Sequence, residues 1–119
     1  RSSSVTGVQT CALPIYIRHC ARLVKTGLFR PPYGRITTSE IKSIYQQNPN
    51  MKIVMWDVLT GDFDTNLTPE KCLKHAVSST KPGSIIVFHD SEKAFKRLEY
   101  ALPRFMEYAS NKGWQFKSL

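Results

Sequence analysis

With 119 residues, the chain has room for one small domain or for part of a larger one. Its hydrophobic content of 41% and charged content of 22% are ordinary for a folded globular chain, and no apolar run is long enough to span a membrane. The net charge of +8 suggests nucleic-acid binding, but the Lys and Arg residues are scattered as on solvated helix faces, so we expect no nucleic-acid partner.

The first fifteen residues, RSSSVTGVQTCALPI, show neither a helical nor a strand period. The stretch from Val5 to Ile15 resembles the in-frame translation of a common short-read sequencing adapter. We therefore expect residues 1–15 to be a non-native segment without stable structure, and the native chain to continue upstream of Tyr16. The subcellular location is left open for the same reason.

Residues 16–26 place apolar side chains at helical spacing and predict a helix. Leu28 and Phe29 follow as the end of a short buried strand. Pro31 and Pro32 forbid a helix and fix an extended turn, so Arg30 is expected to lie on a stiff segment just past that strand.

Two further helices are predicted from their start signals. Thr37 is expected to cap a helix because Glu40, three residues on, completes a capping box, and Asn48 begins the Asn-Pro-Asn stretch that ends it. Thr68 followed by Pro69 marks the start of the next helix.

Two apolar runs predict strands buried on both faces. Residues 51–58, MKIVMWDV, lead into a loop that contains Asp62, and residues 84–88 follow a Pro-Gly turn and lead into His89 and Asp90.

The end of the chain predicts a helix and a strand. Residues 93–111 are amphipathic, with Pro103 expected to bend or restart the helix, and residues 114–116 are expected to form a last short strand. The alternation of helices and strands predicts an α/β fold with a parallel sheet.

Polar side chains follow three of the predicted strands: Arg30, then Asp57 and Asp62, then His89 with Asp90. In parallel sheets, chemistry sits where strands end, so we expect these groups to converge at one edge. A His at that edge can exchange protons near neutral pH, and a neighbouring Asp fixes its tautomer. By itself the His-Asp pair could equally be a structural His followed by a helix-capping Asp. The sequence has no cluster of His residues with metal-ligand spacing, and its cysteines fit no zinc motif.

Three motifs resemble those of the polysaccharide deacetylase family, also called the NodB homology domain. They are FRPPYG at residues 29–34, MWDVLTGDF at residues 55–63 and IIVFHD at residues 85–90, and they resemble the third, fourth and fifth family motifs in order and spacing. The resemblance implies that residues 16–119 are the C-terminal part of such a domain, an incomplete half of a deformed parallel (β/α) barrel.

The family removes N-acetyl groups from amino-sugar polymers such as chitin or peptidoglycan. The resemblance implies a divalent metal, usually zinc, that polarises the amide and its water, an Asp base and a His acid. Carried over by position, His89 would be the acid, Asp62 would tune it, and Arg30 would tether the base.

The same resemblance implies the residues that meet the substrate. The backbone amide of Tyr33 would help to hold the oxyanion, Val87 would line the pocket for the acetyl methyl group, and Trp56 and Phe63 would shape the wall of the groove.

The sequence also departs from the family pattern. Leu59 stands where the family often has Asp, and Phe63 where it often has Trp. The first and second motifs, which supply the base and the metal ligands, are missing, so the resemblance implies a chain that holds no metal and is inactive alone. The alternatives are a non-catalytic sugar-binding relative and a basic α/β nucleic-acid binder. At single positions, Arg30 could form a plain surface ion pair, and Asp57 and Phe29 are better interpreted as structural.

Overall fold

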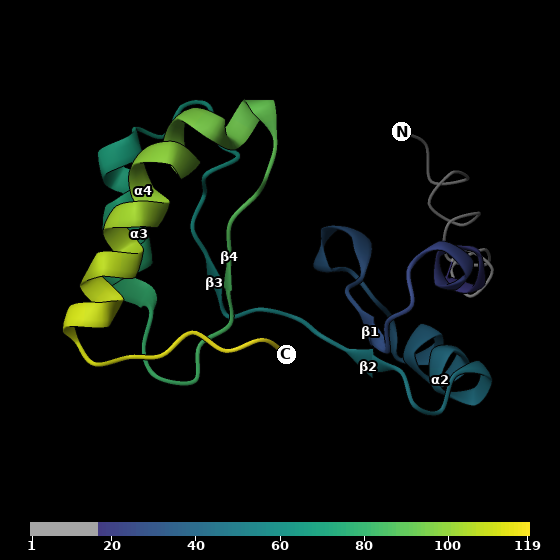
Figure 1. The fold of residues 1–119 in the computed structure, drawn as a ribbon. Coiled ribbons are helices and arrows are strands. Elements are labelled where there is room, and N and C mark those ends of the chain that lie inside the picture. The colour runs from purple at the N-terminus through teal and green to yellow at the C-terminus, as the bar shows by residue number, and fades with distance from the viewer. Residues whose placement is uncertain (1–16) are drawn as a thin grey trace. The chain divides into compact units, whose positions relative to one another are not determined.

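The computed structural model describes residues 17–119, which divide into two compact units on either side of the Met55–Trp56 bond. Figure 1 shows the elements of each unit. The segment predicted to be non-native, residues 1–15, lies outside the described residues. Within residues 17–119, no helix combines the length and the apolar character that a membrane crossing needs.

Among its described residues, 17–55, the first unit contains two short parallel strands, two α-helical segments and one short 3₁₀ helix. Residues 17–23 are helical, and β1 (Leu28–Phe29) pairs with β2 (Lys52–Ile53), with Leu28 opposite Lys52. A short 3₁₀ helix, η1 (Pro32–Gly34), and the helix α2 (Thr38–Gln47) lie between these strands in the sequence.

Both hydrogen bonds of the capping box predicted for α2 are present. Thr37 Oγ1 accepts a hydrogen bond from the Glu40 backbone N–H at 3.2 Å, and Glu40 Oε1 accepts one from the Thr37 backbone N–H at 2.8 Å. This reciprocal pair satisfies two donors that the first turn would otherwise leave open. The helix begins where the capping box placed it.

The core of the first unit forms around Ile17 and Ile44, which are 5% and 0% exposed. Partly buried apolar side chains pack against these two residues: Phe29, Ile36, Met51 and Ile53. The interpretation of Phe29 as a core residue agrees with this packing.

The second unit pairs β3 (Val58–Leu59) with β4 (Ile86–Val87), again in parallel. Two helices, α3 (Pro69–Ser79) and α4 (Glu92–Asn111), pack side by side in this unit (Figure 1). Thr68 Oγ1 accepts a hydrogen bond from the Lys71 N–H, as predicted for a cap. Most of the buried apolar residues in this unit are alanines, and their small side chains let the helices approach closely. The buried apolar residues of the unit are Val58, Cys72, Ala76, Ala94, Ala101, Phe105 and Ala109.

The stretch predicted as one strand, residues 51–58, is instead divided between β2 and β3. Hydrogen bonding explains the division. The Val54 N–H donates to the Phe29 carbonyl at 2.8 Å, whereas the Val58 N–H donates to the Ile85 carbonyl at 3.2 Å. One apolar run therefore serves two separate strand pairs, and the part of the chain that is described contains two two-stranded parallel sheets.

The end of the chain differs from the sequence expectation in two ways. Of the two alternatives at Pro103, the restart is wrong, because α4 continues through Pro103 to Asn111, and the bend stays a prediction. The predicted last strand is also wrong, because residues 114–116 form no strand. Instead, the Trp114 N–H donates to the Ala109 carbonyl at 3.0 Å, and the Phe116 ring packs edge-on against Phe105 at 6.3 Å. Contacts with the helix thus take the place of strand pairing.

Candidate functional site

Asp62 and His89 meet in the second unit, beyond the ends of β3 and β4. The parallel pairing of Leu59 with Val87 brings both strand ends to one edge. Asp62 Oδ1 lies 2.7 Å from His89 Nδ1, and Asp62 Oδ2 accepts a hydrogen bond from the His89 backbone N–H at 2.6 Å. The Asp62 side chain is fully buried, whereas the His89 side chain is 41% exposed. A buried carboxylate therefore binds a histidine that solvent can reach.

Three local features surround the pair: a hydrogen bond between the strand ends, a ring contact on His89 and a glycine with positive φ. The Thr60 hydroxyl donates to the Val87 carbonyl at 3.0 Å and ties the two strand ends together. The Phe63 ring meets the His89 ring edge-on, with centroids 5.4 Å apart and an angle of 75° between the planes. Gly61, immediately before Asp62, has a φ of 80°, which L-residues with side chains adopt at a cost.

Arg97 is a member of this neighbourhood that the sequence interpretation missed. Its Nε donates to the Asp62 main-chain carbonyl at 2.6 Å, its Nη2 donates to the Lys93 carbonyl, and only 5% of the residue is exposed. Its spacing could have indicated its burial. Arg97 follows Ala94 by three residues and precedes Ala101 by four, so all three lie on the buried stripe of α4.

Charge and burial act on two nearby groups. Burial raises the pKa of the Cys72 thiol, and the negative charge of Asp62 raises it further. The Ile85 backbone N–H, which donates to Asp57 Oδ1 at 2.5 Å, lowers the pKa of the Asp57 carboxyl. Asp57 thus binds the chain at the start of β4, in agreement with a structural role.

The Asp62–His89 arrangement can deliver a proton. An ionised carboxylate only accepts hydrogen bonds, so its contact with Nδ1 requires the proton on that nitrogen. The other ring nitrogen, Nε2, is then left to exchange a proton with a bound molecule. Within residues 17–119, no group of three or more His, Cys, Asp or Glu side chains could hold a metal ion.

Two other predicted site residues lie in the first unit. Arg30 Nε donates to the Val54 carbonyl at 3.2 Å. Tyr33, in η1, is 90% exposed and has a φ of 57°, which is uncommon for a residue other than glycine. The predicted convergence of Arg30 with Asp62 and His89 remains a prediction, as does the role of the Tyr33 amide.

The remaining predicted site residues belong to the second unit. Val87 is half-buried in β4, and Trp56 is half-buried just before β3. Phe63 is 39% exposed, and Asp90 is exposed. The structure thus brings together Asp62, His89 and Phe63.

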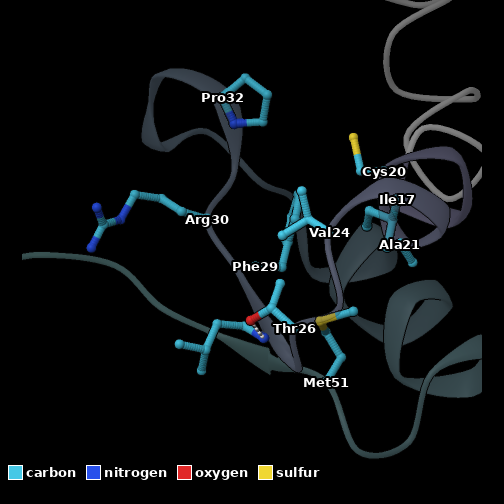
Figure 2. A pocket seen from close by; sticks show the side chains of 10 residues that line it. Ile17, Cys20, Ala21, Val24, Thr26, Phe29, Arg30, Pro32 and Met51 are labelled. Atoms are coloured by element: carbon cyan, nitrogen blue, oxygen red, sulfur yellow. Dashed lines mark hydrogen bonds between the residues drawn. The ribbon is translucent and has the colours of Figure 1, made fainter. Parts of the chain in front are cut away.

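The first unit contains an apolar cavity of about 430 Å³ that the sequence did not indicate. Figure 2 shows Ile17, Cys20 and Val24 on one side of it, with the Arg30 side chain extending away from them. At the edge of this cavity, the Thr26 hydroxyl accepts a hydrogen bond from the Leu28 N–H at 3.1 Å (Figure 2).

The fold is similar to solved structures of carbohydrate deacetylases and esterases. One is the Bc1960 peptidoglycan N-acetylglucosamine deacetylase, at 28% identity and a TM-score of 0.70, over 78% of this chain and 42% of that one. Another is a family 4 carbohydrate esterase from Streptomyces lividans in complex with acetate, at 26% identity and a TM-score of 0.60, over 77% of this chain and 44% of that one.

A third similar structure is a mutant of BA3943, a CE4 family pseudoenzyme with restored enzymatic activity. It matches at 25% identity and a TM-score of 0.56, over 74% of this chain and 30% of that one. The chain therefore spans less than half the length of each of these three proteins. A scan against protein-family models and a search of curated proteins found no match.

Proposed function

Because the chain is a NodB-like relative of the CE4 polysaccharide deacetylases, we propose that residues 16–119 are the C-terminal part of such a domain, an incomplete (β/α) barrel. The complete domain hydrolyses N-acetyl groups of amino-sugar polymers of the chitin or peptidoglycan type. Supporting this substrate class, one similar structure is a peptidoglycan N-acetylglucosamine deacetylase and another contains acetate.

The observation that carries the proposal is the Asp62–His89 pair. Amide hydrolysis adds water to the carbonyl carbon and must protonate the departing nitrogen, because an amide anion is a poor leaving group. In our proposal, His89 acts in its imidazolium form, with a proton on both ring nitrogens. It donates the Nε2 proton to the nitrogen of the sugar as the C–N bond breaks, and is left as the neutral ring with its proton on Nδ1. Asp62 stabilises the orientation and the tautomer that this donation requires.

We assign supporting roles to the other predicted residues. Arg30 tethers the carboxylate of the base. The backbone amide of Tyr33, a residue with a φ of 57°, helps to hold the oxyanion. Val87 lines the pocket for the acetyl methyl group, and Trp56 and Phe63 form the wall of the groove.

The described residues do not fit the metal that the resemblance implies. That metal is a divalent ion, usually zinc, but residues 17–119 offer no group of ligands for it. We propose that the metal ligands and the base come from residues outside those described, and that the present chain is inactive alone.

The first test is an acetate-release assay of the 119-residue chain with acetylated chito-oligosaccharides. We expect no release with or without added zinc. Zinc-dependent turnover by this chain would show that it contains a complete site, which would refute the assignment of the ligands to other residues.

The second test uses a complete enzyme obtained by restoring the coding sequence upstream of Tyr16. We expect His89→Ala to lower kcat much more than it changes KM, because an acid acts on the leaving group in the transition state. The exposed His19 is the matched control, and His19→Ala should leave both parameters unchanged. Near-normal turnover of His89→Ala would make the Asp62–His89 pair structural.

A second candidate is a non-catalytic sugar-binding relative, which the similarity to a CE4 family pseudoenzyme favours. This candidate predicts that the complete protein binds acetylated oligosaccharides without releasing acetate. Calorimetric titration combined with the acetate assay separates the two functions.

A further inference from the structure

Arg97 is a charged residue on the buried face of α4. Its neighbours on that face are Ala94, Ala101 and Phe105, and it is itself only 5% exposed. A guanidinium loses its hydration when it is buried, so an apolar side chain of similar length would be expected there on packing grounds alone. A charge among alanines and a phenylalanine breaks the local pattern, and such breaks concentrate at functional sites.

The hydrogen bonds of Arg97 explain its position. Nε donates to the Asp62 carbonyl oxygen at 2.6 Å, and Nη2 donates to the carbonyl of Lys93, one turn earlier in the same helix. The second bond anchors the guanidinium to α4, and the first joins α4 to the loop after β3. Together they hold the main chain of Asp62 against the helix.

The place of the Asp62 main chain decides where its carboxylate lies. Both carboxylate oxygens are used by His89, one by the backbone N–H at 2.6 Å and one by Nδ1 at 2.7 Å. Hydrogen bonds weaken steeply beyond about 3.2 Å, so a small shift of this loop would break one contact or both.

We propose that Arg97 is a positioning residue for His89: it fixes the Asp62 loop on α4 so that the Asp62 carboxylate sets the orientation and tautomer of the imidazole. The functional meaning of this inference rests on the proposed role of His89 as the acid. Arg97 itself acts through Asp62.

The test uses the full 119-residue chain, labelled with ¹⁵N, and two substitutions. Arg97→Met removes the charge and both donors but keeps an extended side chain, and Arg97→Lys keeps the charge on a single ammonium. The matched control is Arg104→Met, because Arg104 makes the same type of bond, to the Tyr100 carbonyl four residues earlier at 3.0 Å, from the exposed face of α4.

Two signals report the position of His89. The ¹⁵N spectrum of its ring shows which nitrogen carries the proton. Hydrogen exchange of its backbone amide reports the bond to Asp62 Oδ2. The Ile85 amide, which also donates to a carboxylate in the same unit, is the internal reference for general loosening of the unit.

We expect Arg97→Met to lower protection of the His89 amide about tenfold and to leave the Ile85 amide nearly unchanged. The His89 ring should become a mixture of tautomers. Arg97→Lys should give intermediate signals, because one ammonium cannot make both bonds with the geometry of the guanidinium. Arg104→Met should match the wild-type chain.

Equal loss of protection at His89 and Ile85, or unchanged His89 signals in Arg97→Met, would overturn the inference. If Arg97→Met does not fold, Arg97→Lys decides the matter, and wild-type His89 signals in that variant would overturn it. None of these measurements involves turnover. Failure of the acid role would instead appear in the turnover of His89→Ala in the complete enzyme, so the two failures are distinguishable.

Discussion

Removal of the Asp62 carboxylate should destabilise the second unit by about 2 kcal/mol. The carboxylate accepts two hydrogen bonds from His89, and bonds to charged groups contribute about 1.5–3 kcal/mol each. The imidazole is 41% exposed, so in Asp62→Ala its ring nitrogen regains a bond to water and little is lost there. The hydrogen bond from the His89 backbone N–H is partly buried, and we expect its loss to dominate.

The assay is equilibrium unfolding in urea followed by tryptophan fluorescence. Both tryptophans of the chain, Trp56 and Trp114, belong to the second unit, so the signal reports that unit. The matched control is Asp64→Ala, because Asp64 is exposed and its carboxylate accepts one bond, from the Asn66 N–H at 2.9 Å. The control should lose no more than about 0.5 kcal/mol.

A double substitution tests how the loss of unfolding free energy divides between the bond to the His89 ring and the bond to its backbone N–H. In a His89→Ala background the ring bond is absent but the backbone N–H remains, so Asp62→Ala should still cost most of the expected loss of about 2 kcal/mol. Equal losses of the free energy of unfolding in Asp62→Ala and Asp64→Ala would contradict a stabilising role of the Asp62 carboxylate. If the effect of Asp62→Ala vanished in the His89→Ala background, the backbone N–H bond would contribute nothing.

Three further outcomes are expected. A backbone N–H lowers the folded-state pKa of Asp57, so its contribution to stability is present above the ordinary value of 3.8 and is lost as the pH falls through the lower folded value. Acid unfolding curves should therefore be shallower for Asp57→Asn than for the wild-type chain. In the folded chain, iodoacetamide should modify Cys72 far more slowly than the exposed Cys20, because burial shields the Cys72 thiol and raises its pKa; peptide mass spectrometry would show this, and urea should abolish the difference. Gly61→Ala should lower the free energy of unfolding more than Gly83→Ala. Both glycines have positive φ, which costs alanine about 1 kcal/mol, but only at Gly61 would the new methyl group meet a leucine side chain, at 2.9 Å. Equal losses in urea unfolding would contradict the steric argument.

The sequence determined the local features of this protein. Thr37 with Glu40 and Thr68 with Pro69 specified helix starts that the structure confirms, because a cap depends only on residues within one turn. The motif resemblance, which the comparisons confirm, also came from short runs of residues. Helix caps and short motifs can be recognised from a few neighbouring residues, without knowing how the chain folds.

Only the tertiary structure decided how distant segments meet. The apolar run at residues 51–58 looks continuous in sequence, yet its two ends pair with different strands, because pairing depends on partners about 25 residues away in either direction. The same non-local pairing brings Asp62 to His89, and the packing of α4 against the loop then buries Arg97 on Asp62. The sequence interpretation missed Arg97. Its spacing from Ala94 and Ala101 could have placed it on the buried stripe of α4, but a helical period cannot say which main-chain carbonyl a buried guanidinium will reach.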